Sequence, residues 1–98
     1  MPKREIISEK VLEKGLKGVV ELLDGKSYKW VSPGYTGVTD QIVCLPEGRA
    51  AFAEIKTTGK RPTSRQLLVH QELRDLGFIV WVIDDWDSMA GFIKAILK

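Results

Sequence analysis

The sequence is poor in cysteine and has no long apolar segment. Cys44 is the single cysteine among 98 residues, which excludes an internal disulfide and a cysteine-based zinc cluster. Because it stands in the apolar run 42–45, we expect a buried thiol. No stretch approaches the roughly 20 apolar residues of a membrane helix. The charged N-terminus is followed by no signal-peptide core, so we expect an intracellular, cytoplasmic protein.

The sequence also lacks a strong excess of either charge. Fifteen basic and thirteen acidic residues give a formal net charge of +2, which by itself argues for no particular partner. An apolar fraction of 44% and a charged fraction of 29% are typical of a globular protein. At this length we expect residues 1–98 to form a single domain.

Hydrophobic periodicity and turn residues predict an α/β fold with the order α-β-β-β-α-β-α. A meander of three strands followed by a helical crossover to a fourth strand gives a mixed four-stranded sheet flanked by helices. The apolar fourth strand is typical of a central strand covered on both faces. The expected helices span 3–23, 63 or 64 to 76, and 86–97, and the expected strands span 28–31, 40–45, 50–56 and 78–83.

Two acidic residues fall opposite each other in the predicted hairpin. If the turn is centred on Glu47, residues whose numbers sum to 94 are paired, and Asp40 then faces Glu54. Like charges at that separation, roughly 5 Å between Cβ atoms, destabilise a sheet unless they share a proton or a cation. Their oxygens, with the backbone carbonyl of Ile55, would suit Mg²⁺. A bulge in either strand would shift this register.

A lysine lies beside these carboxylates. Lys56 follows Glu54 by two residues and therefore projects from the same face of the strand. It could position or help deprotonate an attacking water, or neutralise charge that builds on a phosphate. Each of these residues alone is common on a solvated strand, but the strand around them is otherwise apolar, and charged residues seldom enter such a strand without partners.

The first helix supplies a candidate third acid. Projected at 100° per residue, Glu9 falls within the angular range of the apolar stripe that contains Leu12 and Leu16, so it could meet the sheet instead of water. Glu13 lies at the edge of the same stripe. Either residue could instead form an exposed pair with a nearby lysine.

These segments together resemble the virus-type replication-repair nuclease (VRR-NUC) domain, a branch of the PD-(D/E)xK nuclease superfamily with a restriction-endonuclease-like fold. The resemblance covers roughly residues 5–84, in the right order and spacing. No single segment is specific, whereas the ordered set is. The matching segments are Ser8 to Leu12, Lys29 to Gly34, Gly37 to Asp40, Gly48-Arg49 through Ala53 to Lys56, Gln66 with His70 and Leu73, and Leu76 to Phe78.

The resemblance implies a role for each site residue. Asp40 and Glu54 would bind the divalent metal, Mg²⁺ or Mn²⁺, and Lys56 would act on the nucleophilic water. Glu9 would contact the metal directly or through water, and Gln66 would lie beside the site. Thr39 stands where the family usually has proline, a departure that removes no ligand. Single-domain proteins of this kind resemble phage-borne enzymes that act on branched DNA as homodimers.

Basic and aromatic residues near the site are candidate DNA contacts. Lys60, Arg61 and Arg65 cluster after the metal-binding strand and could hold phosphates that flank the scissile one. Tyr35 could stack on a splayed base or line the cleft. We therefore expect a structure-selective, metal-dependent endodeoxyribonuclease for branched DNA such as Holliday junctions or flaps. The alternatives are a sequence-specific restriction-like nuclease, a junction-resolving enzyme of another PD-(D/E)xK branch, or a non-catalytic DNA-binding module.

Overall fold

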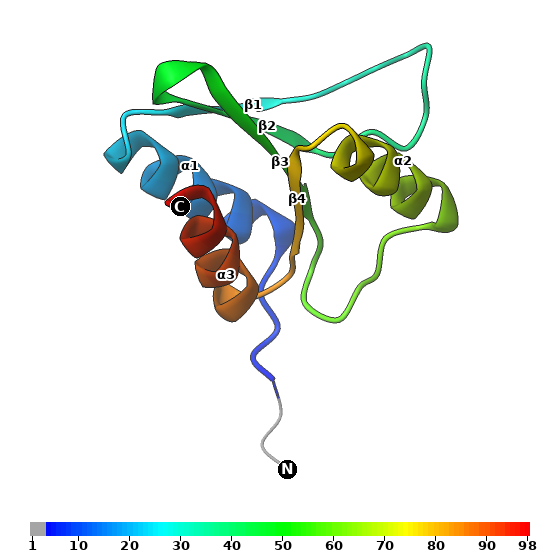
Figure 1. Ribbon diagram of the computed structural model, residues 1–98. Helices are drawn as coiled ribbons and strands as arrows, with labels where there is room; N and C mark the ends of the chain where they lie inside the picture. Colours follow the sequence, from blue (N-terminus) through cyan, green and yellow to red (C-terminus); the bar gives the residue numbers. More distant parts are fainter. Residues whose placement is uncertain (1–3) are drawn as a thin grey trace.

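The computed structural model describes residues 4–98, in which helices cover both faces of a four-stranded sheet (Figure 1). Helices α1 (Glu9–Leu22) and α3 (Trp86–Ile96) lie on one face of the sheet. Helix α2 (Ser64–Asp75) lies on the opposite face. The α/β class and the predicted order of helices and strands are confirmed.

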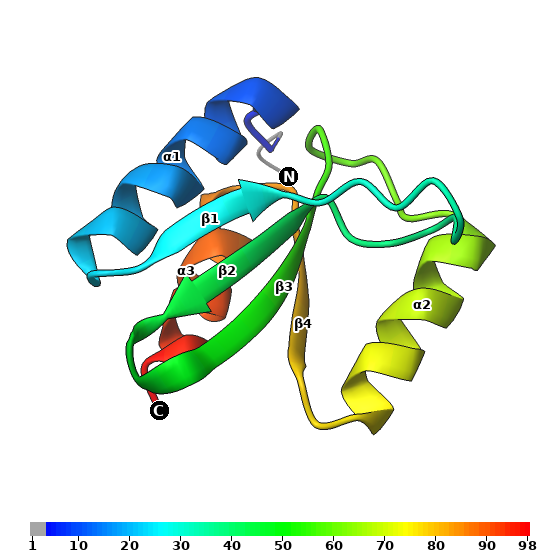
Figure 2. The ribbon, with the colours of Figure 1, turned by 90° about the horizontal axis from the view of Figure 1, so that it is seen from above.

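The strands lie side by side in sequence order, as the view from above shows (Figure 2). The first three strands are antiparallel, and the fourth runs parallel to the third because α2 carries the chain back. The fourth strand is therefore an edge strand, and its predicted central position is wrong. It is apolar because α3 packs against it from one side and α2 from the other. The strands are β1 (Lys26–Lys29), β2 (Gln41–Leu45), β3 (Arg49–Ile55) and β4 (Ile79–Ile83).

The hydrophobic core lies between the sheet and the layer formed by α1 and α3. Alternate residues of β2 and β3 point into it, as the two-residue period of a strand requires. Gly25, which leads into β1, closely approaches β2 and α1, since a Cβ there would lie 2.5 Å from the carbonyl oxygen of Cys44 and 3.1 Å from the Val20 side chain. The core includes Leu12, Leu16, Val20, Val43, Ala51, Ala53, Ile55, Ile83, Met89, Phe92 and Ile96.

Helix α1 is shorter than predicted at its N-terminal end. It begins at Glu9 instead of residue 3, because Ser8 is its N-cap and accepts a hydrogen bond from the backbone N–H of Val11 through its side chain. Lys3 itself lies outside the described residues. The first strand is also displaced, to Lys26–Lys29 from the predicted 28–31. The remaining helix and strand ends fall within one or two residues of the prediction.

The expectation that Cys44 is buried is wrong. Val43 points toward α1 and α3 and is fully buried, so Cys44, its neighbour in the strand, points to the other face. Helix α2 packs against β4, at the far edge of that face, and leaves Cys44 exposed. The prediction failed because an apolar run does not show how much of each face a single helix covers. No helix among residues 4–98 is long and apolar enough to cross a membrane.

Candidate active site

The hairpin of β2 and β3 brings two carboxylates together as predicted. Gln41 pairs with Ala53, so the next position on each strand places Asp40 opposite Glu54. A short 3₁₀ turn, Pro46–Gly48, joins the strands. No bulge alters the register, because every paired position from Gln41 to Leu45 keeps the same offset.

Asp40 is fixed at both its backbone and its side chain. Its carbonyl oxygen accepts a hydrogen bond from Trp30 N–H at 2.8 Å, and its Oδ2 accepts one from Ile55 N–H at 2.9 Å. Burial, and after it a hydrogen bond with the Glu54 carboxyl, raises the pKa of Asp40 from 3.8 to about 6. The Ile55 N–H and the positive charge of Lys56 act against this rise. A cation bound nearby would therefore stabilise the ionised form of Asp40.

Glu54 is fully buried and surrounded by donors. Its Oε2 lies 3.8 Å from Nζ of Lys56 and accepts a hydrogen bond from Nε2 of Gln66 at 3.3 Å. Its Oε1 lies 3.2 Å from Nε2 of His70. The Lys56 side chain retains 17% exposure and Asp40 is half-buried, so solvent reaches the site from their side. All these side chains lie on the α2 face of the sheet.

The capping box of α2 sets the direction of the Gln66 amide. Oε1 of Gln66 accepts a hydrogen bond from Thr63 N–H at 2.9 Å, while the Thr63 hydroxyl accepts one from Gln66 N–H at 3.1 Å. Because the amide oxygen is held by Thr63, the amide nitrogen is turned toward Glu54. The Gln66 side chain therefore caps the start of α2 and donates a hydrogen bond to Glu54 at the same time.

The structure does not bring Glu9 into this cluster. Glu9 is exposed in the first turn of α1, on the face of the sheet opposite α2. The projection placed it toward the core, but Ile7, which is 6% exposed, occupies the buried position at this end of the helix. Glu13 is exposed as well. Within residues 4–98, no three acidic, histidine or cysteine side chains form a ready metal-binding group.

Arg65 and Tyr35 form a connection between α2 and the loop before Asp40. The guanidinium carbon of Arg65 lies 4.6 Å from the centroid of the Tyr35 ring, and its Nε donates a hydrogen bond to the Thr36 carbonyl at 3.0 Å. The Tyr35 hydroxyl donates to the Glu72 carboxylate, at 2.6 Å from Oε1. These contacts, which the sequence did not reveal, hold the loop against the helix.

Lys60 and Arg61 are exposed beside a hollow that adjoins the site. Leu67 of α2 and Val82 of β4 also line the hollow. Val82 is paired with Glu54 in the register of β3 and β4, so the hollow lies next to the buried carboxylate. Of the three predicted basic contacts, Lys60 and Arg61 lie beside the site and form no ion pair within residues 4–98, whereas Arg65 is engaged by the loop.

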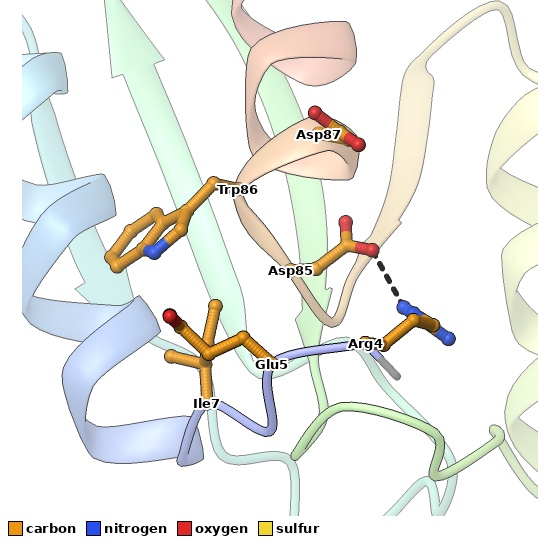
Figure 3. Close-up of a pocket in the computed structure, with 6 residues that line it drawn as sticks. All are labelled: Arg4, Glu5, Ile7, Asp85, Trp86 and Asp87. Atoms are coloured by element: carbon orange, nitrogen blue, oxygen red, sulfur yellow. Dashed lines mark hydrogen bonds and ion pairs between the residues drawn. The ribbon is translucent and has the colours of Figure 1, made fainter. Parts of the chain in front are cut away.

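A second hollow lies near the start of α3 and is unrelated to this cluster (Figure 3). The Arg4 guanidinium lies 2.6 Å from Asp85 and 3.1 Å from Asp84, and it points toward the Asp85 carboxylate in the close-up. Asp85 is also the N-cap of α3, and hydrogen bonds from Ser88 lower its pKa. These contacts anchor the segment before α1 to the start of α3. The charged side chains that line the hollow therefore have a structural role.

No role for His70 is predicted from the sequence, although the structure places it within the cluster. It is fully buried and contacts Glu54 directly. The available signal was spacing, because residues four apart on a helix share one face, and His70 follows Gln66 by four. That spacing could not show that the shared face points at the site, which depends on how α2 packs on the sheet.

The arrangement offers hard oxygen ligands, a primary amine and an amide within one partly buried site. Two adjacent carboxylates, paired among residues 4–98 with no lysine or arginine other than Lys56, suit a divalent ion that prefers oxygen ligands and keeps part of its water shell. The donor set therefore fits Mg²⁺ or Mn²⁺. It does not fit a zinc site of the common type, which uses cysteine and histidine ligands.

Comparisons with known proteins agree with this fold. A comparison with protein-family models finds no match. The chain is 44% identical over 82 residues to a protein of Acyrthosiphon pisum secondary endosymbiont phage 1 named "Putative nuclease p44", covering 84% of this chain and 88% of that protein. A solved structure described as "VRR_NUC domain" superposes with a TM-score of 0.82 at 28% identity, covering 90% of this chain and 97% of that one. The order of the strands, the paired carboxylates and these two relatives place the chain in the VRR-NUC domain family of nucleases.

Proposed function

We propose that this protein is a divalent-metal-dependent endodeoxyribonuclease that acts on branched DNA. The observation that carries the proposal is the pair of carboxylates, Asp40 and Glu54, held side by side on one face with Nζ of Lys56 3.8 Å from Glu54. Membership of a nuclease family supports hydrolysis of phosphodiester bonds as the reaction.

Asp40, Glu54 and the backbone carbonyl of Ile55 would hold Mg²⁺ or Mn²⁺. Glu9 is exposed at the start of α1 and lies outside this cluster, so a contact with the ion would have to run through water. When bound, such an ion lowers the pKa of a coordinated water and polarises a phosphoryl oxygen. The raised pKa of Asp40 supports this assignment, because a carboxyl that is costly to ionise alone becomes favourable to ionise beside a cation.

The remaining side chains position the reactants. Lys56 is paired with Glu54 and still partly exposed, so its ammonium can hold an attacking water or neutralise charge on the phosphate. Gln66 also donates a hydrogen bond to Oε2 of Glu54. Together these donors keep the Glu54 carboxylate in one orientation before DNA arrives.

DNA would enter along the hollow beside α2. Lys60 and Arg61 could bind phosphates there, next to the buried carboxylate. Arg65 and Tyr35 would act mainly by fixing the loop that precedes Asp40. Cutting both strands of a junction requires two active sites related by symmetry, so we propose that the enzyme works as a homodimer.

The test is cleavage of a four-way junction, a flap and a plain duplex at low salt with Mg²⁺, Mn²⁺ or EDTA. Low salt matters because phosphate contacts weaken steeply as the salt concentration rises. We expect metal-dependent cutting that favours the branched substrates. Cutting of the plain duplex at one short motif would instead indicate a restriction-like enzyme, and DNA binding without cutting would indicate a binding module.

Single substitutions test which side chains take part in the reaction. Glu54→Gln and Lys56→Ala should reduce cleavage at least 100-fold, the order expected for loss of a catalytic group. Glu21→Gln, an exposed glutamate of α1, is the matched control and should cut like the unmodified protein. Glu9→Gln and Glu13→Gln, compared side by side, show which acid of α1 contributes. Full activity of Glu54→Gln would refute the site.

A further inference from the structure

We propose that His70 is a positioning residue that fixes the orientation of the Glu54 carboxylate. The proposal rests on the function proposed above and extends it to a residue outside the set of metal ligands. It starts from one contact: Nε2 of His70 lies 3.2 Å from Oε1 of Glu54, and both side chains are fully buried.

Each oxygen of Glu54 has its own donors. Oε1 faces His70, while Oε2 faces Gln66 at 3.3 Å and Lys56 at 3.8 Å. Lys56 and Gln66 belong to the partly exposed side of the cluster, whereas His70 lies on the fully buried side. His70 therefore holds the oxygen away from solvent and leaves the other oxygen turned toward the reactive side.

The hydrogen-bonding capacity of the two groups determines the hydrogen position. A carboxylate only accepts hydrogen bonds, so Nε2 of His70 must carry the hydrogen that joins it to Glu54. Nδ1 of His70 is buried with no partner among residues 4–98. An N–H at Nδ1 would be a buried donor without an acceptor, which is costly, so both ring nitrogens favour the form with hydrogen on Nε2.

Loss of this hydrogen bond should weaken metal binding directly, in addition to any effect of lowered stability. Residues that orient metal ligands typically contribute 10- to 100-fold in metal affinity or activity. Without His70, Oε1 would lose the hydrogen bond from Nε2, and the carboxylate could rotate. We therefore expect His70→Leu to weaken Mn²⁺ binding at least tenfold.

The experiment compares three variants by calorimetric Mn²⁺ titration and thermal unfolding. His70→Leu removes the donor, and His70→Gln retains an amide nitrogen near the position of Nε2. Val69→Ala is the matched control, because Val69 is 3% exposed on the same helix and apolar. We expect His70→Gln to bind Mn²⁺ within about threefold of the unmodified protein, and Val69→Ala to lower the unfolding temperature without weakening Mn²⁺ binding.

Nitrogen-15 NMR of the metal-free protein tests the contact itself. His70 is the only histidine in the chain, so the imidazole signals need no assignment. The expected spectrum shows hydrogen on Nε2 and a bare Nδ1. Hydrogen on Nδ1 with a bare Nε2 would overturn the proposal.

The possible results separate this proposal from the proposed function. If the unmodified protein binds Mn²⁺ and folded His70→Leu binds it equally well, the positioning role is refuted while the metal site stands. If the unmodified protein binds no Mn²⁺, the proposed function fails, and the NMR spectrum alone decides whether His70 orients Glu54. If His70→Leu does not fold, His70→Gln decides: a tenfold loss of affinity in that variant would refute the role of the Nε2 donor.

Discussion

Replacing Asp40 with asparagine should stabilise the metal-free protein at neutral pH. Asparagine keeps an oxygen that can accept the hydrogen bond from Ile55 N–H, and it removes the charge that lies beside Glu54. The variant therefore isolates the cost of ionising Asp40 next to a second carboxylate. Lys56 is the positive charge that partly offsets this cost, and its effect is already included in the raised pKa of Asp40.

The sign and size of the effect follow from the pKa. The pKa of Asp40 rises from 3.8 to about 6 in the folded protein, so between these values the folded state binds more protons than the unfolded state. Stability therefore falls as the pH rises through this window and stays reduced above it. A rise of about 2 units corresponds to about 3 kcal/mol, which solvent screening of a half-buried carboxyl reduces to about 1–1.5 kcal/mol.

Thermal unfolding followed by circular dichroism in EDTA measures this difference. At pH 8 the unfolding temperature of Asp40→Asn should exceed that of the unmodified protein by about 5–10 °C, and at pH 4 the two should nearly coincide. Excess Mn²⁺ should raise the unfolding temperature of the unmodified protein and leave the variant nearly unchanged. A difference that does not depend on pH, or a variant less stable at pH 8, would refute the reasoning.

Two further comparisons test the packing of the helices. Gly18→Ala should stabilise the protein by about 0.5–1 kcal/mol in urea unfolding, because α1 gains a better helix former and a Cβ there meets nothing within 4 Å. Gly15→Ala on the same helix should be destabilising, because its Cβ would lie 2.9 Å from a ring carbon of Trp86; equal effects would contradict the packing of α1 on α3. Thr63→Ala should cost about 1 kcal/mol, because it removes the hydroxyl that accepts the Gln66 N–H. We expect the loosened first turn of α2, which carries the Gln66 amide, also to weaken Mn²⁺ binding measured by calorimetry; lost stability with unchanged affinity would show that the cap and the site are independent.

The sequence predicted the hairpin part of the site well because strand pairing follows simple arithmetic. Once a turn is placed at Glu47, the partner of every residue in both strands is determined, and the observed register agrees. Lys56 then follows from the two-residue period of a strand. These relations are local, so they survive errors of a residue or two at the strand ends.

The parts that failed depend on how separate elements pack. Glu9 lies at the correct angle on its helix, but Ile7 takes the buried position at that end. Cys44 lies in an apolar run, but the helix on its face covers only the far edge of the sheet. The edge position of β4 likewise depends on where the crossover through α2 brings the chain back to the sheet. The composition of the sequence does not specify that place.

Helix α2 connects the two halves of the site, and this explains why the sheet alone could not define it. His70 and Gln66 reach Glu54 from one side of the helix, while Arg65 and Glu72 hold the loop that leads into Asp40. Both carboxylates are thus positioned by the same helix, although they lie on different strands. A shift of α2 along the sheet would move the donors of Glu54 and the loop before Asp40 together. The geometry of the site therefore depends on the position of α2 on the sheet as much as on the register of the hairpin of β2 and β3.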